Sequence, residues 1–560
     1  MSKGILYINA WTEGQTDNYW LDLETFIILH VSQFTESPKL QLKLNILSDK
    51  PQWSNLVVSF SNITYELIKD PSDITQICRW PLLVINNQVV SGLCSVARQV
   101  CRLSTKDSVR KLLGFREACL VACAESSIWT RFCEVDIIRA INQVLKGECV
   151  QDGAFLVPHE IVNFENHLSQ PVRIHNIYKL ARNKKNEQRL NSSTPREQLM
   201  INHDFAEGPY VTLADLILYP CLKLFKTYCD SACIPLKFPL TLAWLQRLDF
   251  PNIGYNCPNN TIVVGSTIYP EINNVSLYNA DPKRTEPVNH TTQNKIEAAL
   301  NLVDQIKPCI TNTGLLYGFD TAFDWSMVPL KASPHCGTLP ANRAQRKCEQ
   351  LESLAKATLA VVKNKSYKIV DFCSGSGHLG ILIACLLPKC HIILVENKER
   401  SLARARETIG NLNLVNVTIV QSNLDYFRGS FDLGLALHAC GVATDLVLKM
   451  CIENKADFVC CPCCYGGIKQ CHKVSYPRSE QYKSLFIVKH LYFNLAHAAD
   501  QTHDLKNVKT RQGYFCMDVI DTDRRLYAME CGYTVHLGKL QPETCTNKNN
   551  LLVGICNERP

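Results

Sequence analysis

Apolar runs that end in small or acidic residues divide the last part of the chain into alternating strands and helices. Residues 367–380 read YKIVDFCSGSGHLG: an apolar run ends at Asp371, small residues and glycines follow, and an apolar helical stretch begins at Leu379. We expect further strands at 391–395, 417–421, 431–437 and 457–461, then two final strands at 533–537 and 551–555. The alternation predicts a Rossmann-like parallel sheet whose last two strands form an antiparallel edge.

The glycine turn after the first of these strands predicts a cofactor site. Gly375 and Gly377 would let bare backbone at a helix N-terminus approach a ligand closely. Glu396 ends the next strand, where a carboxylate can accept hydrogen bonds from both hydroxyls of a ribose. The spacing to Gly380 also matches a dinucleotide fingerprint. Asp371 favours S-adenosylmethionine instead, because a carboxylate suits its ammonium and sulfonium and repels a pyrophosphate.

The same turn resembles the first motif of class I methyltransferases, acid-x-Gly-x-Gly-x-Gly. Asp371 holds the acid position, Gly375 and Gly377 hold the second and third glycines, and Cys373 stands where the first glycine is usual. The resemblance implies that the loop after the third strand holds the adenine. Asn423 and Asp425 both lie in that loop, and the sequence does not choose between them.

Two clusters of histidine and cysteine follow the fourth and fifth strands, at 438–441 and 460–467. Because the carboxyl ends of parallel strands meet at one edge of a sheet, we expect both clusters beside the cofactor. We interpret them as a shaped pocket floor that positions a methyl acceptor in line with the sulfonium. The residues expected on this acceptor side are His438, Cys463, Cys464 and Tyr465.

Other interpretations of these clusters remain open. A zinc site would draw on Cys460-x-x-Cys463 and Cys461-x-x-Cys464, with His438, Cys440, Cys471 and His472 as further ligands. Overlapping pairs around a proline do not all face one ion, so we predict no metal. Cys463 could instead attack a pyrimidine if His438 or Lys469 lowered its thiol pKa. The cysteines could also be small buried hydrophobes.

A helix is expected at 339–357, directly before the cofactor strand. It carries Arg343, Arg346 and Lys347. These cations form either a solvated face or a lid that contacts a substrate phosphate.

The first hundred residues contain a second recognisable pattern. Residues 79–103 read as strand, Asn-Asn turn, strand and helix, which resembles the second half of the thioredoxin-like domain in glutathione S-transferases. The resemblance implies a cis bond at Trp80-Pro81 and a glutathione contact at Ser91. After the first strand there is no convincing catalytic Tyr, Ser or Cys, although Ser2 and Thr12 are present. We therefore expect a degenerate, non-catalytic domain.

Helical periodicity dominates the following segment, including 114–138. Thr212-Leu-Ala-Asp215 is a capping box that opens an apolar helix, as in the transferase C-terminal domain, and we interpret it as structural. The polar, basic insert 182–197 is expected to be a loop. Four parts result: a thioredoxin-like domain at 1–105, an all-helical transferase-like domain at 106–255, a linker at 256–338 with a helix at 294–306, and a class I methyltransferase-like domain at 339–560. The fold class is α/β multidomain.

Composition narrows the cellular setting. The 560 residues include 28 cysteines, and the net charge is +7. The first residues lack a signal-peptide pattern, and no run of about 18 apolar residues predicts a membrane span. Cysteines without secretion indicate reduced thiols, so we expect a cytoplasmic protein that does not contact membranes. The charge permits contact with nucleic acid but does not argue for it.

Several short motifs resemble a methyltransferase clade that includes tRNA acceptor-stem 2′-O-methyltransferases. They are 438–441, Thr444-Asp445, Cys463-Cys464-Tyr465 and 548–551. Those enzymes usually have Cys-Cys-His-His where this chain has Cys-Cys-Tyr-Gly. The resemblance implies an S-adenosylmethionine-dependent methyltransferase with RNA as a candidate substrate, fused to a transferase-like region that docks a protein partner. The alternatives are an inactive scaffold that binds through the transferase-like half, and a glutathione-dependent transferase.

Overall fold

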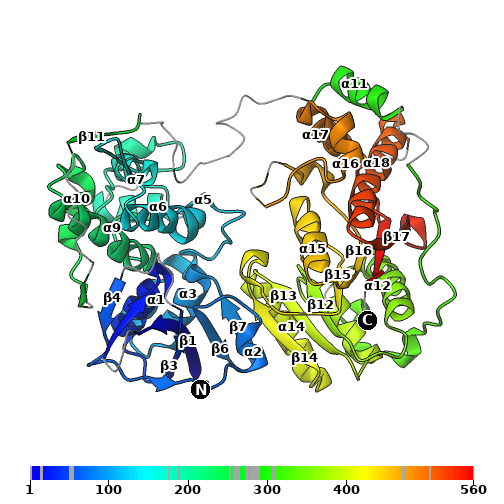
Figure 1. Ribbon diagram of the computed structural model, residues 1–560, viewed down its shortest axis with the longest axis horizontal. Helices are drawn as coiled ribbons and strands as arrows, with labels where there is room; N and C mark the ends of the chain where they lie inside the picture. Colours follow the sequence, from blue (N-terminus) through cyan, green and yellow to red (C-terminus); the bar gives the residue numbers. More distant parts are fainter. Residues whose placement is uncertain are drawn as a thin grey trace. The chain divides into compact units, whose positions relative to one another are not determined.

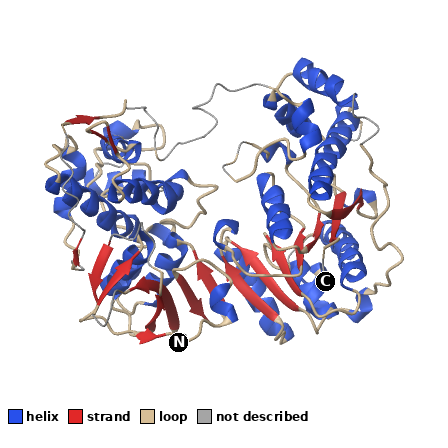
Figure 2. Cartoon of the chain, viewed as in Figure 1, coloured by secondary structure: helices blue, strands red, loops and turns tan. Residues whose placement is uncertain are grey.

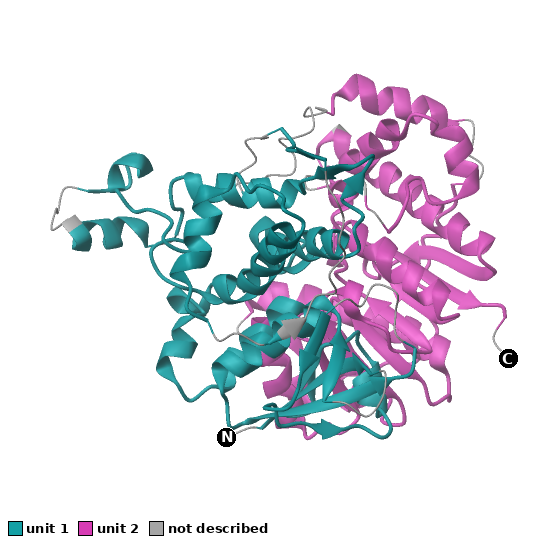
Figure 3. Ribbon diagram, turned by 60° about the vertical axis from the view of Figure 1, so that its left-hand side comes forward, with its two compact units in different colours: residues 1–288 teal, residues 289–560 magenta. Residues whose placement is uncertain are grey.

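The computed structural model forms two compact units, residues 1–288 and 289–560 (Figure 3). The structure describes residues 3–12, 17–49, 56–174, 176–185, 190–250, 254–256, 265–271, 277, 291–304, 310–337, 339–469, 471, 473–502 and 506–558. His472 and Ser2, which the sequence brought forward as candidates, lie outside the described residues.

The first unit begins with a mixed sheet (Figure 2). Its strands and helices are β1 (Gly4–Trp11), β2 (Asn18–Leu21), α1 (Leu23–Thr35), β3 (Leu40–Leu47), β4 (Leu56–Ser59), β5 (Glu66–Leu67), α2 (Asp73–Gln76), β6 (Leu82–Ile85), β7 (Gln88–Ser91) and α3 (Leu93–Leu103). β1 pairs in parallel with β3 and antiparallel with β6, which pairs antiparallel with β7. The peptide bond at Trp80-Pro81 is cis, as the resemblance to the thioredoxin-like domain implied.

Helices make up most of the rest of the first unit. They are α4 (Asp107–Lys111), α5 (Ile128–Arg131), a π-helical turn (Phe132–Asp136), α6 (Ile137–Leu145), α7 (His159–Ser169), α8 (Ile177–Lys185), α9 (Leu213–Ser231) and α10 (Pro239–Arg247). Short strands β8 (Val150–Gln151), β9 (Ala154–Leu156) and β11 (Ser266–Ile268) form a small separate sheet, and β10 (Tyr255–Asn256) pairs with β4. The capping box at α9 is confirmed, since Thr212 N–H donates to the Asp215 side chain (2.8 Å).

Two expectations for this unit were wrong in part. Residues 118–127 form turns rather than helix, since left-handed φ angles at 116, 117 and 120 interrupt the predicted helical run. The insert 182–197 is not all loop, because its first residues continue α8. Apolar spacing alone could not show either boundary.

The second unit contains the predicted Rossmann-like sheet (Figure 1). Its strands are β12 (Lys368–Phe372), β13 (His391–Glu396), β14 (Val417–Gln421), β15 (Leu433–Ala436), β16 (Asp457–Cys460), β17 (Tyr533–Lys539) and β18 (Asn550–Cys556). The order is β14-β13-β12-β15-β16-β18-β17. β12 to β16 are parallel, whereas β18 pairs antiparallel with both β16 and β17, as the sequence predicts. The order reverses beside β12, which places a ligand crevice at the carboxyl ends of these strands.

Helices connect and extend this sheet. They are α11 (Gln293–Val303), α12 (Ala341–Val362), α13 (His378–Leu386), α14 (Glu399–Leu412), α15 (Val442–Glu453), α16 (Glu480–Leu485), α17 (Lys489–Ala498) and α18 (Val508–Glu530). Within the expected linker, the described residues after 288 belong to this unit. α11 packs in a core with α17 and α18, and Leu316 and Val328 pack beneath α12.

A buried ionic network joins several of the motif residues. Arg524 is 1% exposed and donates to both oxygens of Asp445 (3.1 and 2.7 Å) and to Asp521 (3.0 Å). Asp521 also accepts bonds from Tyr465 and Asn550. Because the charges are paired and bonded on every side, burial is tolerated here, but removal of one partner leaves the others uncompensated.

We therefore expect Arg524→Met to destabilise the second unit by about 3–5 kcal/mol, since two buried carboxylates lose their cation. Urea unfolding followed by circular dichroism measures the change. The matched control is Arg525→Met, whose side chain is only partly buried and bonds Thr311. Equal losses of stability in the two variants would contradict a special role for the buried network.

Candidate functional site

The turn between β12 and α13 has the backbone of a ligand cradle. Cys373, Gly375 and Gly377 have φ angles of 54°, 57° and 75°, in the left-handed region that favours glycine. Cys373 therefore keeps the conformation of the glycine it replaces in the motif. A Cβ on Gly377 would lie 2.9 Å from Leu394, whereas one on Gly375 would meet nothing within 4 Å. The turn is thus packed against the sheet at Gly377 and open at Gly375.

Asp371 lies at the end of β12 beneath this turn. Its carboxylate is 2% exposed, and Oδ2 accepts the Gly380 N–H (2.9 Å) from the first turn of α13. Burial raises the pKa of Asp371 to about 7; the Gly380 bond and the Lys347 ammonium oppose this shift, and the nearby Glu396 adds to it. A ligand cation at the turn would favour the ionised form of this carboxyl group.

The carboxylate of Glu396 also accepts hydrogen bonds from the backbone of this turn and of the residues that follow β13. Its Oε2 accepts the Gly375 N–H (2.9 Å), and its Oε1 accepts the N–H groups of Asn397 and Lys398 (2.9 Å each). Each carboxylate oxygen can accept more than one hydrogen bond, so capacity remains for ligand hydroxyls. The side chain fixes the turn and at the same time lies at the end of β13, where the sequence expected it.

Two buried polar atoms near this turn have no hydrogen-bond partner among the residues that the structure describes. Ser374 Oγ lies in the turn itself, and Asn423 Oδ1 follows β14. Buried polar atoms are normally bonded, so an unpaired acceptor beside a crevice marks a place for a ligand group. Asp425 differs, because its Oδ1 forms an ion pair with Lys473 (2.5 Å). Of the two candidates left open by the sequence, Asn423 is the one whose oxygen is buried without a hydrogen-bond partner among the described residues.

Helix α12 places Lys347 beside His438. The sequence left open whether Lys347 lies on a solvated face or in a lid that contacts a substrate phosphate. Lys347 Nζ lies 2.9 Å from His438 Nε2, in the loop after β15. Burial lowers the pKa of Lys347 to about 8, and desolvation together with the Lys347 ammonium lowers the pKa of His438. A protonated Lys347 can only donate, so His438 is neutral and carries its proton on Nδ1.

A basic cavity of about 480 Å³ opens at this pair. Four cationic side chains line it: Arg343, Arg346, Lys347 and Lys548. The other lining residues are Leu339, Gln350, His438 and residues 545–547, and no acidic residue is among the lining residues that the structure describes. Such a surface suits a polyanion.

Tyr465 does not belong to this acceptor side, contrary to the expectation. Its side chain is fully buried, and its hydroxyl donates to Asp521 (2.6 Å) within the Arg524 network. Because Tyr465 directly follows Cys463 and Cys464 in the sequence, it was grouped with the acceptor-side residues, although its side chain belongs to the core. The bond partner lies 56 residues away, so no local pattern could reveal it.

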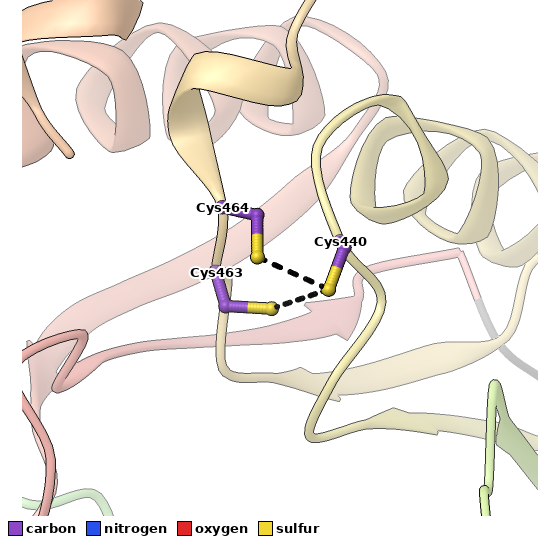
Figure 4. A group of neighbouring side chains, drawn as sticks. All are labelled: Cys440, Cys463 and Cys464. Atoms are coloured by element: carbon purple, nitrogen blue, oxygen red, sulfur yellow. Dashed lines mark hydrogen bonds between the residues drawn. The ribbon is translucent and has the colours of Figure 1, made fainter. Parts of the chain in front are cut away.

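The cysteines separate into two groups. Cys440, Cys463 and Cys464 converge (Figure 4), with Cys440 Sγ 3.3 Å from Cys463 Sγ and 3.2 Å from Cys464 Sγ. Cys460 and Cys461 are buried at the end of β16, and the Cys461 thiol donates to the Lys548 carbonyl. The overlapping Cys-x-x-Cys pairs considered for zinc therefore do not meet in the described part of the chain.

The thiol at Cys463 is not activated as a nucleophile. Its hydrogen bond to Cys440, followed by burial, raises the pKa of Cys463, while the bonds from its two neighbours lower the pKa of Cys440 to about 6. The hydrogen bonds within this cluster therefore favour ionisation of Cys440 over ionisation of Cys463.

In the first unit, the position implied for glutathione is occupied by protein contacts. Ser91 is 1% exposed, and its hydroxyl donates to the Arg79 carbonyl (2.8 Å). None of the helices in the described part of the chain has the length and apolar composition that a membrane crossing requires.

Comparison with known proteins places these features in context. A family model described as a methyltransferase domain matches residues 346–471. The chain is 38% identical to the glutathione S-transferase C-terminal domain-containing protein homolog of Drosophila melanogaster, over 99% of each chain. It is 32% identical to the human glutathione S-transferase C-terminal domain-containing protein, over 97% of this chain and 96% of the relative.

Two solved structures are similar to this chain at low sequence identity. Magnesium protoporphyrin IX methyltransferase from Synechocystis with bound SAH is 10% identical, with 46% of this chain and 98% of that chain covered and a TM-score of 0.25. The fibrillarin pre-rRNA processing protein of Methanococcus jannaschii is 10% identical, with 35% and 68% covered and a TM-score of 0.22.

Because the Lys347 ammonium disfavours a second positive charge, Lys347→Gln is expected to raise the pKa of His438 toward the ordinary value near 6.5. NMR titration of ¹⁵N-histidine-labelled protein measures this, with His438→Gln to assign the signal. Arg346→Gln removes a neighbouring exposed cation and serves as the control. An unchanged His438 pKa in Lys347→Gln would mean that the two groups do not interact in solution.

Proposed function

The chain belongs to the family of glutathione S-transferase C-terminal domain-containing proteins, and we propose that its second unit transfers a methyl group from S-adenosylmethionine to RNA. The methyltransferase domain and its cofactor class follow from the family model and the sheet order. The acceptor and the residue roles are the proposal. The observation that carries it is a basic cavity whose Lys347 also interacts electrostatically with Asp371, beneath the cofactor turn.

The residues of the turn suit S-adenosylmethionine. Asp371 supplies negative charge beneath the turn for a cationic ligand, and Glu396 remains able to accept bonds from the ribose hydroxyls. Gly375 leaves open the space that a side chain would fill. We assign Asn423, rather than Asp425, as the acceptor for the adenine amino group, because its buried Oδ1 has no protein partner.

The basic cavity supports RNA as the acceptor. Phosphate groups bind lysine and arginine through charge-assisted bonds. The lining offers four such side chains, of which Lys548 is already ion-paired with Asp500 (3.2 Å). His438 and Lys347 lie at the same cavity, next to the end of β15. We propose that these two side chains face the reacting group while Arg343 and Arg346 hold the neighbouring phosphates.

The cofactor supplies an electrophilic methyl group when bound, and the protein's task is to align the acceptor with it. Alignment of two reacting groups can lower the activation free energy by several kcal/mol, and by about 7–11 kcal/mol in the most favourable cases. Neutral His438, with Nε2 bonded to Lys347, can orient the acceptor group only through its Nδ1–H, so the proton that the acceptor loses on methylation passes to solvent. Its lowered pKa keeps the ring neutral at physiological pH.

For the first unit we propose a non-catalytic role in binding a protein partner. Its Ser91 hydroxyl is already bonded to the backbone, which does not favour a glutathione-dependent transferase. Every described cysteine is a free thiol, in keeping with the proposed cytoplasmic location. Retention of the chain on a glutathione column would argue against this assignment.

If Glu396 binds the ribose, Glu396→Gln should weaken S-adenosylmethionine binding about tenfold or more, since two bonds lose the full negative charge. Isothermal calorimetry measures the change in Kd. The control is Glu407→Gln, an exposed acid on α14. Circular dichroism must show an intact fold, because Glu396 also fixes the turn; wild-type affinity in a folded variant would remove the ribose role.

If RNA is the acceptor, substitutions in the basic cavity should weaken RNA binding without changing cofactor binding. The double variant Arg343→Gln/Arg346→Gln should bind RNA about tenfold more weakly and with a smaller salt dependence, while cofactor affinity is unchanged. Fluorescence anisotropy at several salt concentrations measures binding, and Arg400→Gln/Arg404→Gln, exposed on α14, is the control. Transfer of labelled methyl to a nuclease-resistant protein fraction instead of RNA would overturn the proposed acceptor.

A further inference from the structure

We infer that Cys440, Cys463 and Cys464 form a three-thiolate metal site, and we assign zinc as the ion it takes. The three sulfur atoms all lie within 4.8 Å of one another. Figure 4 shows them facing each other from two separate loops, after β15 and after β16. Cys440 and Cys464 are exposed, unlike the cysteines that fill the core. Exposed thiols that converge from distant positions are better explained by a ligand than by packing.

The sulfur spacing suits a metal better than a disulfide. Thiolates on tetrahedral zinc lie about 2.3 Å from the ion, which places neighbouring sulfurs about 3.8 Å apart. The two observed distances of 3.2 and 3.3 Å need to lengthen by only about 0.5 Å to reach that geometry. A disulfide would require both sulfurs to approach to about 2.05 Å.

The backbone around the cluster brings the two loops together. Cys440 and Cys463 form an isolated parallel bridge, and the Gly441 N–H donates to the Cys463 carbonyl (3.0 Å). A Cβ on Gly441 would lie 2.8 Å from the carbonyl carbon of Gly467, so only glycine allows this approach. Cys464 has a left-handed φ of 49°, uncommon for a residue with a side chain.

The charged side chains around the cluster are compatible with a metal ion that has three protein ligands and one open coordination position. Lys398 and Lys548 act electrostatically on the cluster, and Asp500, ion-paired with Lys548 (3.2 Å), opposes them. The two lysines and Asp500 together leave one positive charge, which offsets the net negative charge of three thiolates on a divalent ion. Both oxygens of Asp500 accept backbone N–H groups, from Tyr465 and Gly466. Three protein ligands then leave a fourth position for water or a small molecule, as in reactive zinc sites. This set differs from the overlapping pairs that the sequence suggested.

The inference does not rest on the proposed methyltransferase reaction, so it can be tested without cofactor or RNA. The full chain is purified under reducing conditions, incubated with zinc and dialysed against a weak competing chelator. Native mass spectrometry and elemental analysis are expected to show one retained zinc. Cobalt(II) in its place should give the near-ultraviolet thiolate-to-metal absorption of a sulfur-ligated ion.

The variants decide whether this cluster holds the ion. Cys440→Ser and Cys464→Ser should each lower retained metal at least tenfold, whereas Cys531→Ser, an exposed cysteine elsewhere in the second unit, should retain it. Thermal melts check that all variants fold. Zinc retained equally by Cys440→Ser, or no zinc retained by the wild type, would overturn the site. An intact mass two mass units below that of the reduced chain, with no metal bound, would show that the cluster forms a disulfide and not a metal site.

Discussion

The crevice of the second unit depends on two carboxylates that are held by backbone N–H groups. Asp371 bonds the first turn of α13, and Glu396 bonds the turn that precedes it. Together they hold a five-residue turn in which Cys373, Gly375 and Gly377 have left-handed φ angles, a conformation that is easy for the two glycines and strained for Cys373. Because the carboxylates lie at the ends of β12 and β13, the sheet order sets their separation. The cofactor site is therefore a consequence of strand pairing.

The acceptor side depends on helix α12, which lies before the sheet in the chain. Gln350 and Ser353 bond the backbone of 541–545, so the helix is fixed against the loop between β17 and β18. With the helix in this position, Lys347 lies beside His438 and lines the basic cavity. Opposite it, the Arg524 network fixes the start of α15 and the residues after β16. Both loops that carry the clustered cysteines are thus anchored in the core.

Much of this arrangement could be predicted from local patterns. Apolar runs that end at Asp371 and Glu396 showed the strands, and the glycine spacing showed the turn. The clusters at the ends of β15 and β16 were expected to meet because parallel strands share an edge. Cys373 shows the limit of a motif, because its side chain differs from the usual glycine while its backbone does not.

Other features could not be predicted because they depend on distant partners. Tyr465 has the neighbours of an active-site residue, yet its hydroxyl bonds an aspartate on α18. Lys347 has the sequence context of a solvated helix face, yet it is partly buried against a histidine 91 residues away. The choice between Asn423 and Asp425 required the knowledge that Lys473 already pairs with one of them.

The most direct test of the cofactor site is a crystal structure of the chain with S-adenosylhomocysteine, the product form of the cofactor. We predict the ribose hydroxyls on Glu396, the adenine amino group on Asn423 Oδ1, and the amino acid end at the turn above Asp371. A ligand bound elsewhere, or a turn closed by side chains that fill the space beside Gly375, would contradict the account.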